Sequence, residues 1–102
     1  MYLFMNGFSP KLQDFACAVL EELDFVLPFD LNIDYEDIDA HGYCFGDEDV
    51  CFIEINPNLT ERETAIAIAH ELVHARQLAQ GVDFCEEEAY NLESVLTERC
   101  YH

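Results

Sequence analysis

The segment from residue 60 to residue 81 constrains the fold of this chain more than any other. It opens with Thr60-Glu61-Arg62-Glu63, a T-x-x-E capping box that begins a helix. The residues that follow, 64–69 (TAIAIA), are apolar on nearly every side, and Gly81 can supply a left-handed cap at the other end. Because such a helix has little polar face, it has to lie in the interior, and the rest of the chain must fold around it.

Two further helices and three strands are predicted around this central helix. Ser9-Pro10 is a typical helix start, and the N-terminal helix that follows ends before Pro28. Strands are predicted at 31–36, 43–45 and 50–55, the last two joined as a hairpin, and a final helix runs from about 83 or 85 to 99. The order α-β-β-β-α-α predicts one α+β domain over residues 1–102, with a small three-stranded, mainly antiparallel sheet.

The charge of the chain restricts its partners. Its 102 residues contain four Lys and Arg against 22 Asp and Glu, which gives a formal net charge of −18. Binding to nucleic acid or to an anionic membrane requires clustered cations, so we expect neither partner. The acidity favours basic partners or metal cations, and the sequence does not predict an oligomeric state.

Cysteine usage and the N-terminus indicate the compartment. The five cysteines are an odd number without a C-x-x-C pair, which is unlike the disulfide framework of a small secreted protein. The first ten residues lack the basic region of a signal peptide, and we expect them to belong to the mature chain. The sequence therefore predicts reduced cysteines and a cytoplasmic location.

The central helix carries His70-Glu71-Leu72-Val73-His74, an H-E-x-x-H motif. Both histidines project from one helix face, one turn apart, so that both can bind a single Zn²⁺ ion. Glu71 lies beside them as the expected general base for a water whose pKa the metal lowers. The alternative is a pair of partly buried histidines satisfied by carboxylates, but three such groups on an apolar helix are costly without a metal or partners.

Catalytic zinc sites usually have three protein ligands, so a third is expected outside the motif. The histidine pattern of the metzincins is excluded, because both positions 77 and 80 are Gln. The glutamates of the last helix are the expected donors. Glu86 is favoured because it shares a helix face with the small Ala89, while Glu88 and Glu93 stay open as alternatives. Asp83 and Glu86 also form a capping-box pattern, which gives Glu86 a competing structural role.

Residues 69–77 (AHELVHARQ), followed by 86–90 (EEEAY), resemble the gluzincin metallopeptidases. The similarity is closest to the very small ones, the minigluzincins and the SprT-like or phage-type metallopeptidases, and covers residues 50–93. The resemblance implies that His70, His74 and Glu86 bind zinc and that Glu71 is the catalytic base. It also implies that strand 50–55 is a sheet edge that pairs with an extended peptide substrate.

The chain departs from this family in two respects. Many gluzincins have an Asp four residues after the ligand glutamate, and here Tyr90 stands there. The DNA-repair relatives carry basic surfaces that this chain lacks. The residue that stabilises the oxyanion is not assigned, and the candidates are Tyr43, Tyr90, Tyr101 and His102.

The sequence thus predicts a zinc-dependent metallopeptidase acting on peptide or protein substrates, with basic ones favoured. The alternative is a non-enzymatic acidic binding protein, either a decoy that imitates DNA or an inactive metal-binding module. His41 is expected to be a loop histidine. Cys44 and Cys51 are expected opposite each other across the hairpin, either as a disulfide or as two small core residues.

Overall fold

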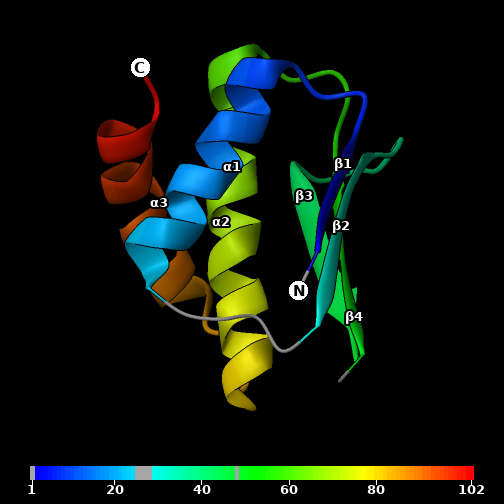
Figure 1. The fold of residues 1–102 in the computed structure, drawn as a ribbon, viewed down its shortest axis with the longest axis vertical. Helices are drawn as coiled ribbons and strands as arrows, with labels where there is room; N and C mark the ends of the chain where they lie inside the picture. The colour runs from blue at the N-terminus through cyan, green and yellow to red at the C-terminus, as the bar shows by residue number, and fades with distance from the viewer. Residues whose placement is uncertain (1, 25–28, 48) are drawn as a thin grey trace.

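The computed structural model describes residues 2–24, 29–47 and 49–102. Its elements are β1 (Leu3–Asn6), α1 (Pro10–Leu23), β2 (Asp30–Tyr35), β3 (Gly42–Gly46), β4 (Val50–Ile55), α2 (Glu61–Gln80) and α3 (Glu86–Cys100) (Figure 1). The predicted α+β class is confirmed.

The sheet differs from the prediction in strand number and in pairing. Its order is β1-β2-β4-β3, with β1 parallel to β2, β2 parallel to β4, and β3 antiparallel to β4. The prediction of three mainly antiparallel strands was therefore wrong: there are four strands in a mixed sheet. The missed strand β1 pairs Leu3 with Leu31, and α1 forms the crossover that a parallel pair requires.

The position of β4 also corrects an expectation. Strand 50–55 was expected to be a sheet edge, but β4 lies between β2 and β3 and is paired on both sides. The two edges of the sheet are β1 and β3. Of these, β3 contacts α2, so it is the strand edge next to the H-E-x-x-H motif.

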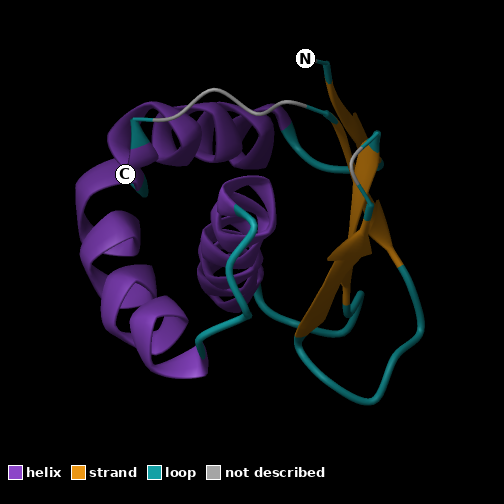
Figure 2. Ribbon diagram, turned by 90° about the horizontal axis from the view of Figure 1, so that it is seen from below, coloured by secondary structure: helices purple, strands orange, loops and turns teal. Residues whose placement is uncertain are grey.

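Helix α2 is the centre of the molecule, as its apolar sequence predicts. Figure 2 shows it end-on in the middle, with the sheet on one side and α1 and α3 on the others. The Thr60 capping box is formed, and Gly81 ends the helix in the left-handed conformation with φ of 71°. Fully buried side chains along α2 complete the core, among them Ala65, Ile68, Ala69, Leu72 and Val73.

Helix α3 begins later than the capping-box pattern suggested. It starts at Glu86 with Cys85 as N-cap, and no side chain caps it, so the competing role of Glu86 in a capping box with Asp83 is not found. Cys85 is exposed, whereas Ala89 and Leu96 are buried. Ala89 has no exposed surface, which is consistent with a close approach of α3 to α2.

No helix of the described residues lies over the outer face of the sheet (Figure 1). Exposed aromatic side chains lie there, and the strand register aligns Phe4, Phe52 and Phe45 in one row across the sheet. The Phe45 and Phe52 rings stack with centroids 5.5 Å apart. Among the described helices, none is long and apolar enough to cross a membrane.

Candidate metal centre

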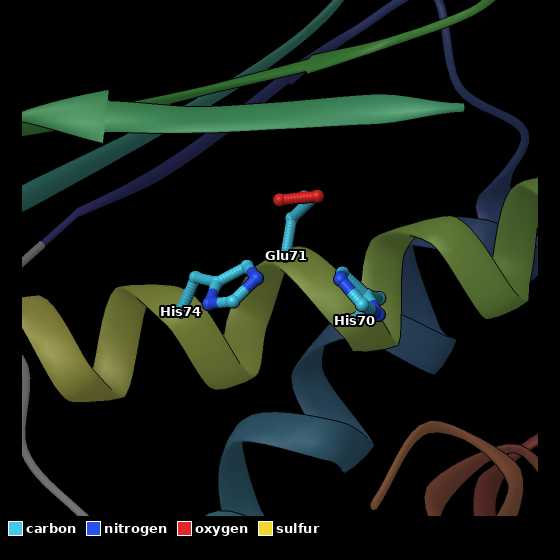
Figure 3. Close-up of side chains that lie close together, drawn as sticks. All are labelled: His70, Glu71 and His74. Atoms are coloured by element: carbon cyan, nitrogen blue, oxygen red, sulfur yellow. The ribbon is translucent and has the colours of Figure 1, made fainter. Parts of the chain in front are cut away.

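His70, Glu71 and His74 form a compact cluster on α2 (Figure 3). One potential ligand atom from each lies within 4.8 Å of the others, so this group can hold a metal ion. The two imidazole centroids are 4.9 Å apart, one helical turn along the same face. The His70 and His74 side chains are only 12% and 3% exposed.

The hydrogen bonds of Gln77 fix which nitrogen of His74 carries the proton. The Gln77 side-chain nitrogen faces two acceptors, the carbonyl of Cys85 at 3.2 Å and Oε1 of Glu88 at 3.1 Å. Its oxygen accepts from the backbone N–H of Cys85 at 3.0 Å and lies 2.8 Å from Nδ1 of His74. Because an amide oxygen only accepts, Nδ1 must be the protonated nitrogen, which leaves Nε2 with its lone pair.

This Nε2 of His74 is buried and, within the described part of the chain, has no hydrogen-bond partner. Glu86 Oε1 lies 2.7 Å away, at a distance of close contact but without the geometry of a hydrogen bond. Two atoms that both carry lone pairs face each other here. A metal ion bound by both atoms, or a second proton on the imidazole, would stabilise this contact.

His70 is held by two glutamates of α3. Its Nε2 lies 3.1 Å from Oε2 of Glu86, and its Nδ1 lies 3.1 Å from Oε2 of Glu93. The carboxylate of Glu86 therefore contacts the Nε2 atoms of both histidines, one with each oxygen. Glu93 holds the opposite nitrogen of His70, in the way that a carboxylate orients a metal-binding imidazole.

The three candidate glutamates lie in different surroundings. Glu86 meets the histidines, and Glu93 supports His70 from behind. Glu88 points toward Arg76, with 3.5 Å between Nη2 and Oε1, and toward Gln77. Of the three, Glu86 is thus the residue whose carboxylate faces both imidazole Nε2 atoms.

Glu71 points away from the two imidazole rings, toward the sheet (Figure 3). A Cβ atom at Gly42 of β3 would lie 3.0 Å from its Cγ, so the strand approaches the glutamate there as closely as a glycine allows. Burial raises the pKa of Glu71 to about 7, and the charges of His70 and His74 partly oppose this rise. A carboxyl group with a pKa in this range suits a general base near neutral pH.

A cleft of about 630 Å³ opens beside these residues, between residues 40–43 and helices α2 and α3. His70, Glu71 and Glu86 line it, and so does the predicted loop histidine His41. Its polar and aromatic lining gives the site access to solvent and space for a ligand.

The structure separates the four candidates for an oxyanion donor. Tyr43 and Tyr90 line the cleft; the Tyr43 hydroxyl donates to Asp39, and the Tyr90 ring packs 4.8 Å from that of His70. Tyr101 instead donates to Glu61 at the start of α2. It lines a separate surface depression together with His102, and neither residue lines the cleft.

The structure thus brings together the four predicted site residues, His70, Glu71, His74 and Glu86. Two residues that position them were not predicted from the sequence. Gln77 was considered only as the absent third histidine of another pattern, and Gly42 only as part of a connection. No local signal identifies either role. Only the approach of the α2–α3 loop to Gln77 and of β3 to Glu71 reveals them.

Comparisons of the chain with family models, with curated proteins and with solved structures gave no match.

Proposed function

We propose that this chain is a zinc-dependent metallopeptidase of the minimal gluzincin type, with His70, His74 and Glu86 as metal ligands. The observation that carries the proposal is the buried Nε2 of His74, which has no hydrogen-bond partner among the described residues and lies 2.7 Å from the carboxylate of Glu86. Both atoms would serve as ligands of a bound metal ion, which would account for two lone-pair-bearing atoms lying so close together.

The chemistry of the donor set supports zinc. Two imidazole nitrogens and one carboxylate oxygen are common zinc ligands, whereas Ca²⁺ and Mg²⁺ prefer oxygen donors throughout. Iron(II) is bound by the same set in some enzymes, so the metal must be identified by measurement. A ligand set of His70, His74 and Glu71 is the other arrangement, but Glu71 points toward β3 rather than between the rings.

The reaction that follows is the hydrolysis of a peptide bond. A bound zinc ion would supply a Lewis acid that acidifies a water and polarises the substrate carbonyl. Glu71, at the wall of the cleft, takes a proton from the attacking water and passes it to the departing amine. Gln77 holds His74 and Glu93 holds His70 at Nδ1, so that Nε2 of each ring faces Glu86 and would be free to bind the metal.

The substrate is an extended peptide, with basic side chains favoured. Strand β3 is a free edge whose Gly42 and Tyr43 line the cleft, and unpaired backbone groups of such an edge can bind a peptide as an added strand. Glu86 and Glu93 make the cleft acidic, and the chain carries a net charge of −18. Both features favour cationic peptides over acidic ones.

The test is hydrolysis of a peptide library by the purified protein after its metal content has been determined. We expect cleavage that is lost with a chelator and restored by zinc. Glu71→Gln should retain the metal and the fold but lose about 10²–10⁴ in rate, because the amide cannot accept the proton. Equal rates for this variant and the parent would refute the mechanism.

The compartment proposed for this activity is the cytoplasm. All five cysteines are free thiols in the structure, including Cys44 and Cys51, whose sulfur atoms lie in contact. Free thiols are typical of reducing compartments.

A second candidate function, an acidic binding protein, is favoured by the outer face of the sheet. Phe45 and Phe52 are exposed there, beside the half-buried Asp34 and Glu54. All the cations of the chain lie on the helices instead: Lys11, Arg62, Arg76 and Arg99. Aromatic rings and carboxylates together suit the guanidinium groups of a basic protein.

The two functions are separable by matched variants. If the sheet face is a binding surface, Phe45→Ser should weaken binding of an arginine-rich peptide, while Glu71→Gln should leave that binding unchanged. Equal binding by the parent and by Phe45→Ser would contradict this second function.

A further inference from the structure

Cys44 of β3 and Cys51 of β4 lie with their sulfur atoms 3.5 Å apart. They are not directly opposite, as the hairpin pattern suggested, because the register pairs Cys44 with Ile53 and Gly46 with Cys51. They are diagonal neighbours on the same face of the sheet. Cys51 is fully buried, whereas Cys44 on the edge strand is partly exposed.

Gly46 explains why the two sulfur atoms can meet. It stands opposite Cys51, where a Cβ would clash with the carbonyl oxygen of Val50 and lie 2.8 Å from Cα of Cys51. A side chain therefore cannot occupy this position. The Cys44 thiol reaches Cys51 diagonally across a position that carries no side chain of its own.

We propose that Cys44 and Cys51 are a disulfide-forming site, which a small disulfide oxidant such as oxidised glutathione closes into a covalent link between β3 and β4. A disulfide bond measures about 2.05 Å, so the sulfur atoms of this pair, now 3.5 Å apart, must approach by about 1.5 Å. Because the two strands are already paired, the link does not require a change of fold.

The reaction is two thiol–disulfide exchanges. The Cys44 thiolate attacks one sulfur of oxidised glutathione, forming a mixed disulfide and releasing one glutathione thiolate, which takes up the proton lost by Cys44. The Cys51 thiolate then attacks the Cys44 sulfur and expels the second glutathione, which takes up the proton lost by Cys51. Two cysteine thiols are oxidised and one glutathione disulfide is reduced to two thiols.

The exposure of the two residues assigns the order of attack. Cys51 is fully buried, whereas Cys44 on the edge strand keeps part of its surface exposed, so Cys44 is the more open of the two thiols to oxidised glutathione. Cys51 already lies in contact with the Cys44 sulfur, so the second exchange is intramolecular and outcompetes a second glutathione. The link fixes the strand that presents Gly42 and Tyr43 to the cleft.

The test incubates the reduced full chain in glutathione redox buffers, blocks the remaining thiols by alkylation, and maps the peptides by mass spectrometry without reduction. We expect a disulfide between Cys44 and Cys51, a mass lower by about 2 Da before alkylation, and three alkylated cysteines of the five. The oxidised protein should also melt at a higher temperature than the reduced one, because the unfolded chain is constrained.

Two kinds of variant control the assignment. Cys44→Ala and Cys44→Ser should each lose the bond, and at least one of them is expected to fold, because Cys44 lies on an edge strand. Cys17→Ala, which removes an exposed cysteine of α1, should keep the bond. The proposal is overturned if glutathione modifies Cys17 or Cys85 while no linked Cys44–Cys51 peptide forms, or if the Cys44 variants still lose two thiols on oxidation.

Discussion

Nδ1 of His74 lies 2.8 Å from the side-chain oxygen of Gln77, which also accepts a hydrogen bond from the backbone of Cys85 at 3.0 Å. One buried amide thus joins the candidate metal ligand to the loop that leads into α3. It fixes the imidazole tautomer and holds the start of α3, where Glu86 lies, close to the histidines. Through Gln77, the position of Glu86, the proposed third ligand, therefore depends on the same side chain that orients His74.

Gln77→Met tests this link. Methionine has a similar length but cannot accept from His74 or from the backbone N–H of Cys85. We expect zinc affinity to fall by about 10–100-fold, and stability to fall by about 1–3 kcal/mol because a buried donor loses its acceptor. Competition with a chromophoric chelator and denaturant unfolding measure the two effects. Gln80→Met, at the exposed end of α2, is the matched control and should change neither.

The three glutamates of α3 should differ in their effect on zinc binding. Glu86→Gln should weaken binding by orders of magnitude, because it removes the negative charge from the carboxylate that faces both histidines. Glu93→Gln should cost about 10–100-fold through His70, and Glu88→Gln should have little effect. Full retention of zinc by Glu86→Gln, with loss in either of the other two, would refute the assignment of Glu86.

Gly42→Ala should impair hydrolysis without releasing the metal. The new Cβ would lie 3.0 Å from Cγ of Glu71 and 3.1 Å from the carbonyl oxygen of Glu54, so the glutamate or the strand must shift. A general base displaced in this way transfers protons less well, so kcat should fall while zinc affinity stays near that of the parent. An unchanged kcat would show that Glu71 does not need its present position.

Sodium chloride should raise the melting temperature of the protein. The chain has a net charge of −18, and its carboxylates repel one another in the folded state. About 0.15 M salt screens the repulsion between charges that lie more than roughly 8 Å apart. If substrates are basic, the same salt should lower kcat/KM for cationic peptides. A melting temperature that is constant across sodium chloride concentrations would argue against self-repulsion. Chloride is preferred to sulfate, because sulfate stabilises proteins by a separate mechanism.

Local signals were sufficient to predict the start of α1 and both ends of α2. Ser9 accepts from the backbone of Leu12, the Thr60 capping box forms, and Gly81 ends α2, all as their residue types indicate. Each of these features depends on residues within one or two turns of each other. The same holds for His70 and His74, because their spacing alone places them on one face of a helix.

Features that depend on distant residues were missed or left open. Strand β1 has four residues and is defined by pairing with β2 across 28 positions, which no local pattern encodes. The choice among Glu86, Glu88 and Glu93 depends on where α3 begins and how it crosses α2. Helix α3 starts at Glu86 after a loop, so its first residue meets the histidines. If α2 and α3 were strictly antiparallel, Tyr90 or Glu93 would lie at the level of the histidines instead.

The most direct test of the proposed metal centre is a crystal structure of the zinc-loaded protein with anomalous data collected on both sides of the zinc absorption edge. We predict one zinc peak with Nε2 of His70, Nε2 of His74 and a carboxylate oxygen of Glu86 at about 2.0–2.2 Å. The Glu71 carboxylate should lie outside this set of ligands, toward β3. An absent peak, or a zinc ion bound by Glu71 in place of Glu86, would contradict the account.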